Sequence, residues 1–134
     1  MSPILVADDD ADESYLLVRA FEEVGVRNPV HVVPDGEAAI AFLKNNRPCL
    51  VLLDQQLPGC SGLDVLQWLR NGSSLSTVPV ILLSASTYDS DVQAAYLVGA
   101  NGYVVKPTQY EKTVALAKAI ADYWLAFNRT PYPG

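Results

Sequence analysis

Cysteine and histidine are scarce in this sequence of 134 residues. The two cysteines, Cys49 and Cys60, are too few for a disulfide scaffold in a chain long enough to build its own core, so we expect both to be reduced thiols. The single histidine, His31, lies in a short apolar run and is expected to be a strand-edge residue. A zinc site and a histidine-based catalytic centre are therefore not expected.

The sequence also lacks clustered positive charge and long apolar runs. Nine Lys and Arg stand against 15 Asp and Glu, a net charge of −6, so direct nucleic-acid binding is not expected. No run approaches the roughly 18 apolar residues that span a bilayer, and the first residues lack the features of a signal peptide. We expect a cytoplasmic protein without a membrane partner.

The composition is that of a globular protein, with 50% apolar and 18% charged residues. Short apolar runs alternate with segments of helical periodicity along the whole chain, which predicts an α/β doubly wound domain with a parallel sheet. The apolar runs are residues 4–7, 30–33, 49–53, 80–83 and 103–105, and the helical patterns between them are 15–24, 36–44, 63–70 and 92–98.

The last helical pattern, residues 108–128, is unusually long and has two apolar stripes, more than one core-facing surface requires. We therefore expect one domain over residues 1–128, ending in this long helix, and a tail over 129–134. Exposed aromatic side chains on this side of the molecule would form a protein interface. The candidates are Tyr96, Tyr103, Tyr123 and Phe127.

Polar residues follow the predicted strands where each one ends. Asp8 and Asp9 end the first, Asp54 the third, Ser84 the fourth and Lys106 the fifth. The carboxyl ends of parallel strands meet at one edge of a sheet, where such folds bind ligands. Clustered carboxylates at this edge favour a hard divalent cation, and Mg²⁺ suits them because it prefers oxygen ligands.

Four segments resemble the signature blocks of response-regulator receiver domains: VADD at residues 6–9, LDQQLPGCSG at 53–62, LSA at 83–85 and GYVVKP at 102–107. The resemblance implies a flavodoxin-like fold of five parallel strands in the order 2-1-3-4-5 with five helices. It also implies a two-component response regulator whose Asp54 accepts a phosphoryl group from a sensor histidine kinase in the presence of Mg²⁺.

The resemblance also assigns roles around the phosphoacceptor Asp54, which itself contacts the metal. Asp9 would be a direct metal ligand, Asp8 a ligand through water, and Gln56 a ligand through its backbone carbonyl. Lys106 and Ser84 would hold the phosphoryl oxygens.

The predicted switch is a movement of Ser84 toward the phosphate while Tyr103 turns inward. The Lys106–Pro107 bond is expected to be cis. Serine stands at position 84 where the family more often has threonine, which keeps the hydroxyl.

The resemblance at the start and end of the chain is closer to single-domain regulators that partner phytochrome-type histidine kinases. A homodimer through the fourth helix, fifth strand and fifth helix is the expected assembly. The chain is not expected to be an enzyme beyond assisting its own phosphotransfer and dephosphorylation.

Two other functions fit parts of the pattern. Phosphatases of the haloacid-dehalogenase type also use an Asp nucleophile with Mg²⁺, but they need an acid/base Asp where this chain has Gln56. A scaffold that works without phosphorylation would not need the intact acidic site.

Three further acidic residues, Asp10, Asp12 and Glu13, are expected to be solvated charges at a helix start.

Overall fold

A computed structural model describes residues 1–72 and 74–131. Five parallel strands form one sheet in the order β2-β1-β3-β4-β5, as the resemblance implied. The strands are β1 (Ile4–Ala7), β2 (Val30–Val33), β3 (Leu50–Asp54), β4 (Val80–Ser84) and β5 (Gly102–Val105). The helices are α1 (Ala11–Glu23), α2 (Gly36–Asn45), α3 (Gly62–Arg70), α4 (Asp89–Val98) and α5 (Tyr110–Ile120), followed by η1 (Ala121–Phe127).

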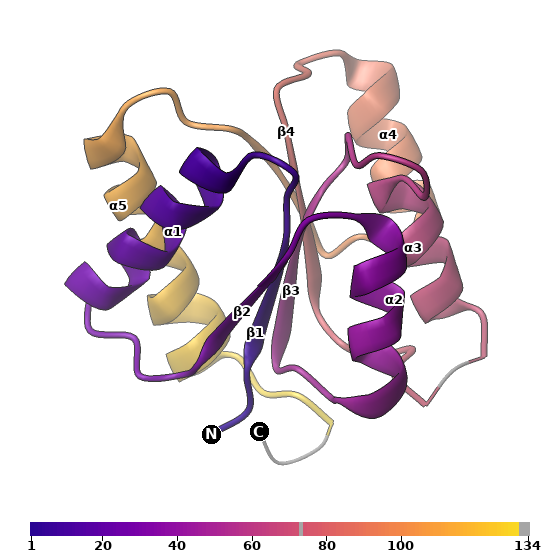
Figure 1. The fold of residues 1–134 in the computed structure, drawn as a ribbon, viewed down its shortest axis with the longest axis horizontal. Coiled ribbons are helices and arrows are strands. Elements are labelled where there is room, and N and C mark those ends of the chain that lie inside the picture. Colours follow the sequence, from indigo (N-terminus) through magenta and orange to yellow (C-terminus); the bar gives the residue numbers. More distant parts are fainter. Residues whose placement is uncertain (73, 132–134) are drawn as a thin grey trace.

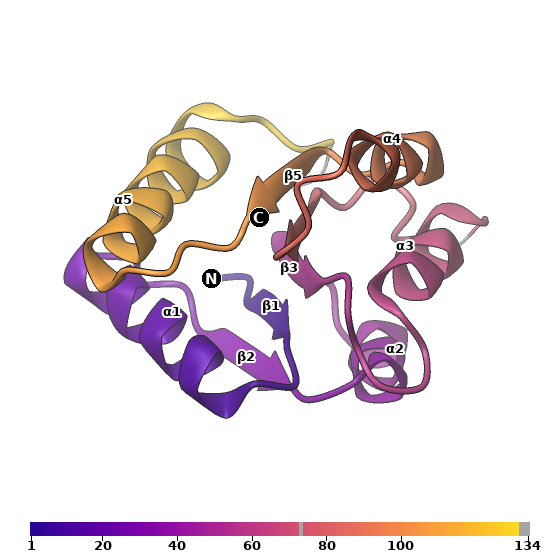
Figure 2. The same ribbon diagram turned by 90° about the horizontal axis from the view of Figure 1, so that it is seen from above.

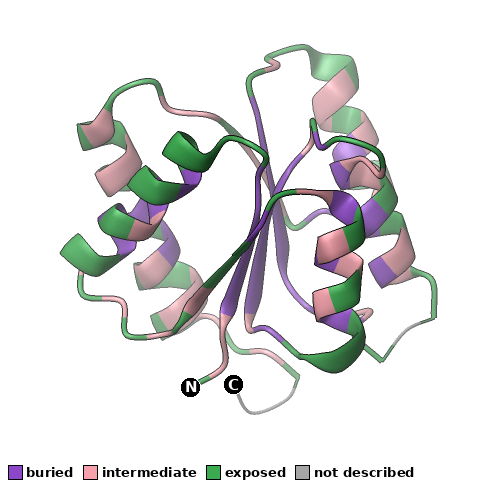
Figure 3. Ribbon diagram, viewed as in Figure 1, coloured by how far each residue is buried: buried purple, intermediate pink, exposed green. Residues whose placement is uncertain are grey.

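The helices cover the sheet from both sides, with α1 and α5 together on one face and α2, α3 and α4 on the other (Figures 1 and 2). Each face has its own apolar core, one built around Leu53, Leu66 and Leu82 and the other around Phe21, Leu52 and Ile120. Every residue of β1, β3 and β4 is buried, which explains why their sequences are continuously apolar (Figure 3). The predicted fold class is confirmed.

Side-chain caps determine where the first three helices begin. The Asp10 carboxylate accepts hydrogen bonds from the backbone N–H groups of Asp12 and Glu13, so α1 begins four residues before the predicted segment. Asp35 caps α2 in the same way, and Ser61 and Asp64 form a reciprocal capping box at α3.

Helix α4 is held more weakly than the others on its side of the sheet. Its first turn has no side-chain cap, and Ala95 is its only buried residue. Leu97 is 80% exposed and Tyr96 is 51% exposed. Helix α3, in contrast, buries four residues and carries the capping box.

The final helix begins at Tyr110 rather than at residue 108, and its last turns are π-helical rather than α-helical. Trp124 and Leu125 are half-buried against the core beneath α1 and α5, whereas Phe127 is exposed. The helix ends at Phe127, and residues 132–134 of the predicted tail lie outside the described residues. None of the described helices combines the length and apolar character needed to cross a bilayer.

Candidate functional site

The parallel arrangement brings four of the predicted site residues to the carboxyl-terminal edge of the sheet. Asp8 directly follows β1, Asp54 is the last residue of β3, Ser84 is the last residue of β4, and Lys106 directly follows β5. Asp54 pairs in register with Leu83 and Ser84 with Val105, so the strand ends are level with one another. Side chains from positions up to 98 residues apart therefore meet in one site.

An acidic cluster forms the centre of this site. Carboxylate oxygens of Asp8, Asp9 and Asp54 lie within 4.8 Å of one another. Asp8 and Asp54 are buried, at 6% and 3% exposed, while Asp9 lies at the surface. The donor set is made only of oxygen atoms, which is the ligand type of hard divalent cations.

Lys106 is the cation that faces this cluster. Its Nζ lies 2.8 Å from Asp54 Oδ2, 2.7 Å from Glu13 Oε2 and 3.5 Å from Asp8 Oδ2. Burial alone would lower the pKa of Lys106, but its hydrogen bonds with Asp54 and Glu13 outweigh that effect and raise the pKa above its usual 10.5. The ammonium group therefore keeps its charge at physiological pH.

One positive charge is too few for the carboxylates around it. Burial raises the pKa of Asp8 from 3.8 to about 6, against the lowering effects of the Asp10 backbone hydrogen bond and the Lys106 charge. The negative charges of Asp54 and Glu13 add to the rise. A site with this excess of negative charge would gain stability from a further cation.

The loop after β3 fixes the orientation of the Asp54 carboxylate. Asp54 Oδ1 accepts a 2.9 Å hydrogen bond from the backbone N–H of Gln56. The chain then folds back so closely that a Cβ atom at Gly62 would overlap the Asp54 carbonyl oxygen, which explains the glycine at this position. Gln56 lies beside Asp54, and metal binding through its carbonyl stays a prediction.

A hydrogen-bond chain connects Ser84 with Tyr103 through the loop between β4 and α4. The Ser84 hydroxyl oxygen accepts a 3.0 Å bond from the backbone N–H of Ser86. The Tyr103 hydroxyl donates to the backbone carbonyl of Ser86 at 3.0 Å, with Gln55 Oε1 as an alternative acceptor at 3.4 Å. The proposed switch residues are thus joined by one loop residue.

Two expectations need correction. Glu13 was expected to be a solvated helix-start charge, but its carboxylate forms an ion pair with Lys106. Only the position of Glu13 in the first turn of α1, one turn beyond the acidic run, could have suggested this contact. The Lys106–Pro107 bond is trans, like all peptide bonds among the described residues, and trans is the isomer that X-Pro bonds favour by about 0.5–1 kcal/mol.

The sequence model of the response regulator receiver domain matches residues 4–118. The chain belongs to this family. Receiver domains are generally signalling domains rather than enzymes, and both the strand order and the acidic edge of the sheet agree with this assignment.

Two curated relatives match almost the whole receiver chain. The probable methanogenesis regulatory protein FilR2 of Methanothrix harundinacea is 35% identical over 136 residues, which cover 97% of this chain and 88% of that protein. The response regulator Rcp1 of Synechocystis is 30% identical over 129 residues, covering 91% and 88%. In contrast, the chain spans 49% of the length of the DNA-binding response regulator MtrA of Mycobacterium tuberculosis.

Solved structures of the same kind superpose closely on this receiver. The phosphorylated cyanobacterial phytochrome response regulator RcpA has a TM-score of 0.91 at 28% identity, with 98% of this chain and 99% of that chain covered. The Mn²⁺-bound form of Rcp1 has a TM-score of 0.89 at 28% identity, with 98% and 100% covered. The chain is thus similar to phytochrome response regulators in sequence and in structure.

Proposed function

We propose that this receiver accepts a phosphoryl group on Asp54 from a sensor histidine kinase, with Mg²⁺ in the acidic cluster, and signals by changing its protein contacts. The position of Asp54 carries the proposal. The Asp54 side chain is 4% exposed, and its carboxylate lies 2.8 Å from the Lys106 ammonium group and shares a cluster with Asp8 and Asp9.

The residues present fit a divalent metal ion. Asp8, Asp9 and Asp54 supply oxygen ligands, and the pKa of Asp8 is raised mainly by burial and further by the charges of Asp54 and Glu13, so a bound cation would favour its ionised form. We assign direct binding to Asp9 and Asp54, binding through water to Asp8, and a backbone carbonyl ligand to Gln56. When bound, Mg²⁺ neutralises negative charge on the phosphoryl oxygens.

The chemistry of the transfer follows from the residues around Asp54. An oxygen of its carboxylate forms a bond to phosphorus while the bond between phosphorus and the donor histidine nitrogen breaks. Lys106 stabilises the charge on the phosphoryl oxygens as a fixed cation. The Ser84 oxygen already accepts the Ser86 N–H, so its own proton is available to a phosphoryl oxygen.

Phosphorylation would be transmitted through the loop between β4 and α4. A shift of Ser84 toward the phosphoryl group pulls on Ser86, whose carbonyl binds the Tyr103 hydroxyl. Tyr103 would then become more buried and change the surface formed by α4 and β5. An NMR spectrum in which Tyr103 signals stay unchanged on beryllofluoride addition would contradict this step.

The output we infer is a homodimer through α4, β5 and α5. Tyr96 and Leu97 of α4 and Tyr123 and Phe127 of η1 are exposed apolar side chains on this side of the molecule, which supports an interface there. Because RcpA is a phytochrome response regulator, we infer a phytochrome-type kinase as the partner. A monomeric mass in light scattering with and without beryllofluoride would rule out the dimer.

Acetyl phosphate with Mg²⁺ tests the proposed phosphorylation directly. Intact-protein mass spectrometry should show one added phosphoryl group on the wild type and none on Asp54→Asn. Asp64→Asn is the matched control, because Asp64 caps α3 outside the acidic cluster and this variant should be labelled like the wild type. A wild type that neither gains the phosphoryl group nor binds beryllofluoride would refute the proposal.

A further inference from the structure

Glu13 is the carboxylate closest to Lys106 that the proposed phosphotransfer does not use. We propose that Glu13 is a positioning residue, which holds the Lys106 ammonium group in the orientation that serves the phosphoryl group on Asp54. This inference rests on the proposed function, because it concerns the efficiency of the same reaction. It begins from the ion pair of 2.7 Å between Lys106 Nζ and Glu13 Oε2.

The three N–H donors of the ammonium group are directed at three carboxylates. The bonds to Asp54 and Glu13 are short, at 2.8 Å and 2.7 Å, and the contact with Asp8 is longer, at 3.5 Å. Phosphorylation converts the Asp54 carboxylate into an acyl phosphate, and Asp8 is proposed to bind the metal ion through water. Glu13 is the one partner whose role need not change.

The backbone on both sides of this ion pair is anchored. The backbone N–H of Glu13 donates to Asp10 Oδ1, which caps the first turn of α1. The backbone N–H of Lys106 donates to the Ser84 carbonyl at 2.8 Å. Two fixed backbones leave the side chains as the only movable parts of the contact.

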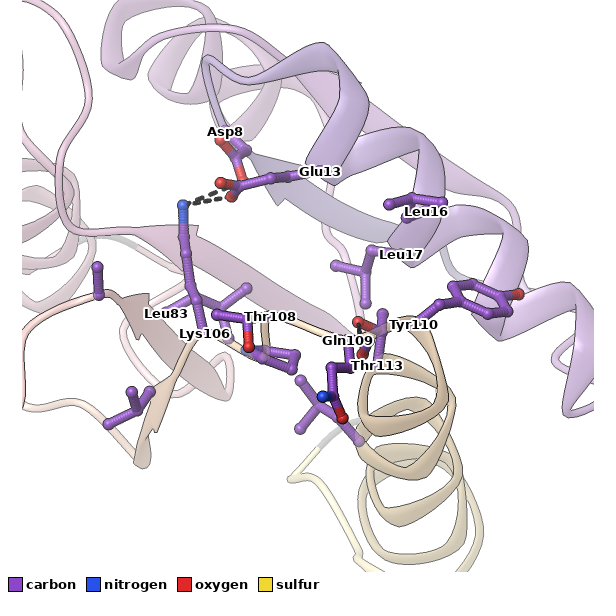
Figure 4. Close-up of a pocket in the computed structure, with 14 residues that line it drawn as sticks. Asp8, Glu13, Leu16, Leu17, Leu83, Lys106, Thr108, Gln109, Tyr110 and Thr113 are labelled. Atoms are coloured by element: carbon purple, nitrogen blue, oxygen red, sulfur yellow. Dashed lines mark hydrogen bonds and ion pairs between the residues drawn. The ribbon is translucent and has the colours of Figure 1, made fainter.

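A cavity beside Lys106 leaves room for its side chain to adopt other orientations. The cavity has a volume of about 530 Å³, lies between α1 and the segment leading into α5, and is lined by Leu17, Gln109 and Thr113 as well as by Lys106 and Glu13. In Figure 4 the Lys106 side chain points toward Asp8 and Glu13 rather than toward Gln109 and Thr113. A flexible four-carbon side chain has room to turn into this space when its partner is removed.

Asp12 provides a matched comparison for Glu13. Both are acidic residues in the first turn of α1, so both interact with the helix dipole in the same way. The Asp12 carboxylate has no hydrogen bond or ion pair within the described part of the chain, whereas Glu13 binds Lys106. Asp12→Asn therefore removes the same charge from the same turn without touching Lys106.

The experiment compares Glu13→Ala, Glu13→Gln and Asp12→Asn with the wild type by two measurements. The first is NMR of the Lys106 side-chain ammonium group in the unphosphorylated protein, assigned with Lys106→Arg. The second is the rate of labelling by acetyl phosphate as a function of its concentration. Thermal unfolding of each variant separates a loss of fold from a local effect.

We expect the ordered Lys106 ammonium signal to be lost in Glu13→Ala, partly kept in Glu13→Gln, whose amide oxygen can still accept, and unchanged in Asp12→Asn. The limiting labelling rate should fall about threefold in Glu13→Ala relative to Asp12→Asn, the size of effect given by a partly exposed ion pair. The half-saturating concentration should be equal in these two variants, because Glu13 does not bind the phosphodonor.

The positioning role is overturned if the Lys106 signal is unaffected by Glu13→Ala, or if Glu13→Ala and Asp12→Asn are labelled at the same limiting rate. A wild type that is not labelled at all refutes the proposed function instead. In that case the NMR comparison still decides whether Glu13 orders Lys106, since it needs no phosphorylation.

Discussion

Replacing Asp8 by Asn should stabilise the metal-free protein at neutral pH, although it removes a contact. The pKa of Asp8 rises from 3.8 to about 6 in the folded protein, because burial disfavours its charged form. This rise corresponds to about 3 kcal/mol of folding free energy lost when the group is ionised. Asn keeps an oxygen that can accept the Asp10 N–H, and the lost contact with Lys106 is long, at 3.5 Å.

The pH dependence has a definite sign. Between about pH 4 and pH 6 the folded protein holds a proton on Asp8 that the unfolded chain has released, so stability due to this group falls as the pH rises. Below about pH 4, Asp8 is protonated in both the folded and the unfolded protein, so the wild type and Asp8→Asn should be equally stable. Above about pH 6 the variant should be more stable by up to about 3 kcal/mol, or about 10 °C in Tm.

Urea unfolding in EDTA at several pH values between 4.5 and 7.5 measures the difference directly. Asp12→Asn, which removes an exposed carboxylate of α1, should change stability by less than about 0.5 kcal/mol at every pH. Addition of Mg²⁺ should then stabilise the wild type by about 2.7 kcal/mol at one hundred times its dissociation constant, and Asp8→Asn by less at the same Mg²⁺ concentration. An Asp8→Asn protein that is less stable than the wild type at pH 7.5 in EDTA would refute the reasoning.

Three further outcomes follow from the packing. Gly62→Ala should destabilise the fold by about 1–3 kcal/mol in urea unfolding, because a Cβ atom there would overlap the Asp54 backbone carbonyl. Gly102→Ala should be tolerated in the same assay, because a Cβ atom there makes only ordinary van der Waals contacts. Burial, with the charges of nearby carboxylates, raises the pKa of the Cys60 thiol, so iodoacetamide should modify it more slowly at pH 8 than a cysteine peptide, and equal rates would contradict this. Arg70→Ala should lower the free energy of unfolding by about 2 kcal/mol, because the guanidinium group of Arg70 donates to three backbone carbonyls and one side chain. In the same urea unfolding assay, Arg47→Ala should lower it by less than about 1 kcal/mol, because Arg47 lies at an exposed site.

The sequence was sufficient to predict the sheet because each strand is marked by a local pattern, a short apolar run. Strands β1, β3 and β4 are buried on both faces, so their residues are apolar without interruption and the polar residue that ends each run marks the strand end. Asp54 and Lys106 could be assigned to one site because parallel strands bring their carboxyl ends together. The contact of 2.8 Å between them follows from that geometry.

The features that the sequence did not predict depend on contacts between distant segments or on weak preferences. Glu13 looks like any acidic residue of a first helical turn, and only the fold shows that Lys106 lies beside it. The π-helical end of the last helix has the same apolar spacing as an α-helix, so the pattern of residues 108–128 could not distinguish the two. The isomer of the Lys106–Pro107 bond depends on a small energy difference that a sequence motif does not report.

The weak attachment of α4 has a consequence for how the molecule moves. Opening this helix exposes one fully buried residue, Ala95, and the half-buried Val98, and it breaks the hydrogen bond between Ser86 and Asp91. Opening α3 exposes four buried residues and breaks its capping box. The amide protons of α4 should therefore exchange with deuterium well before those of α3, at a free energy far below that of global unfolding. The receiver thus has a rigid half around its central strands and a low-energy excited state confined to one helix, so a signal that enters at the sheet edge can reorganise α4 without loosening the fold.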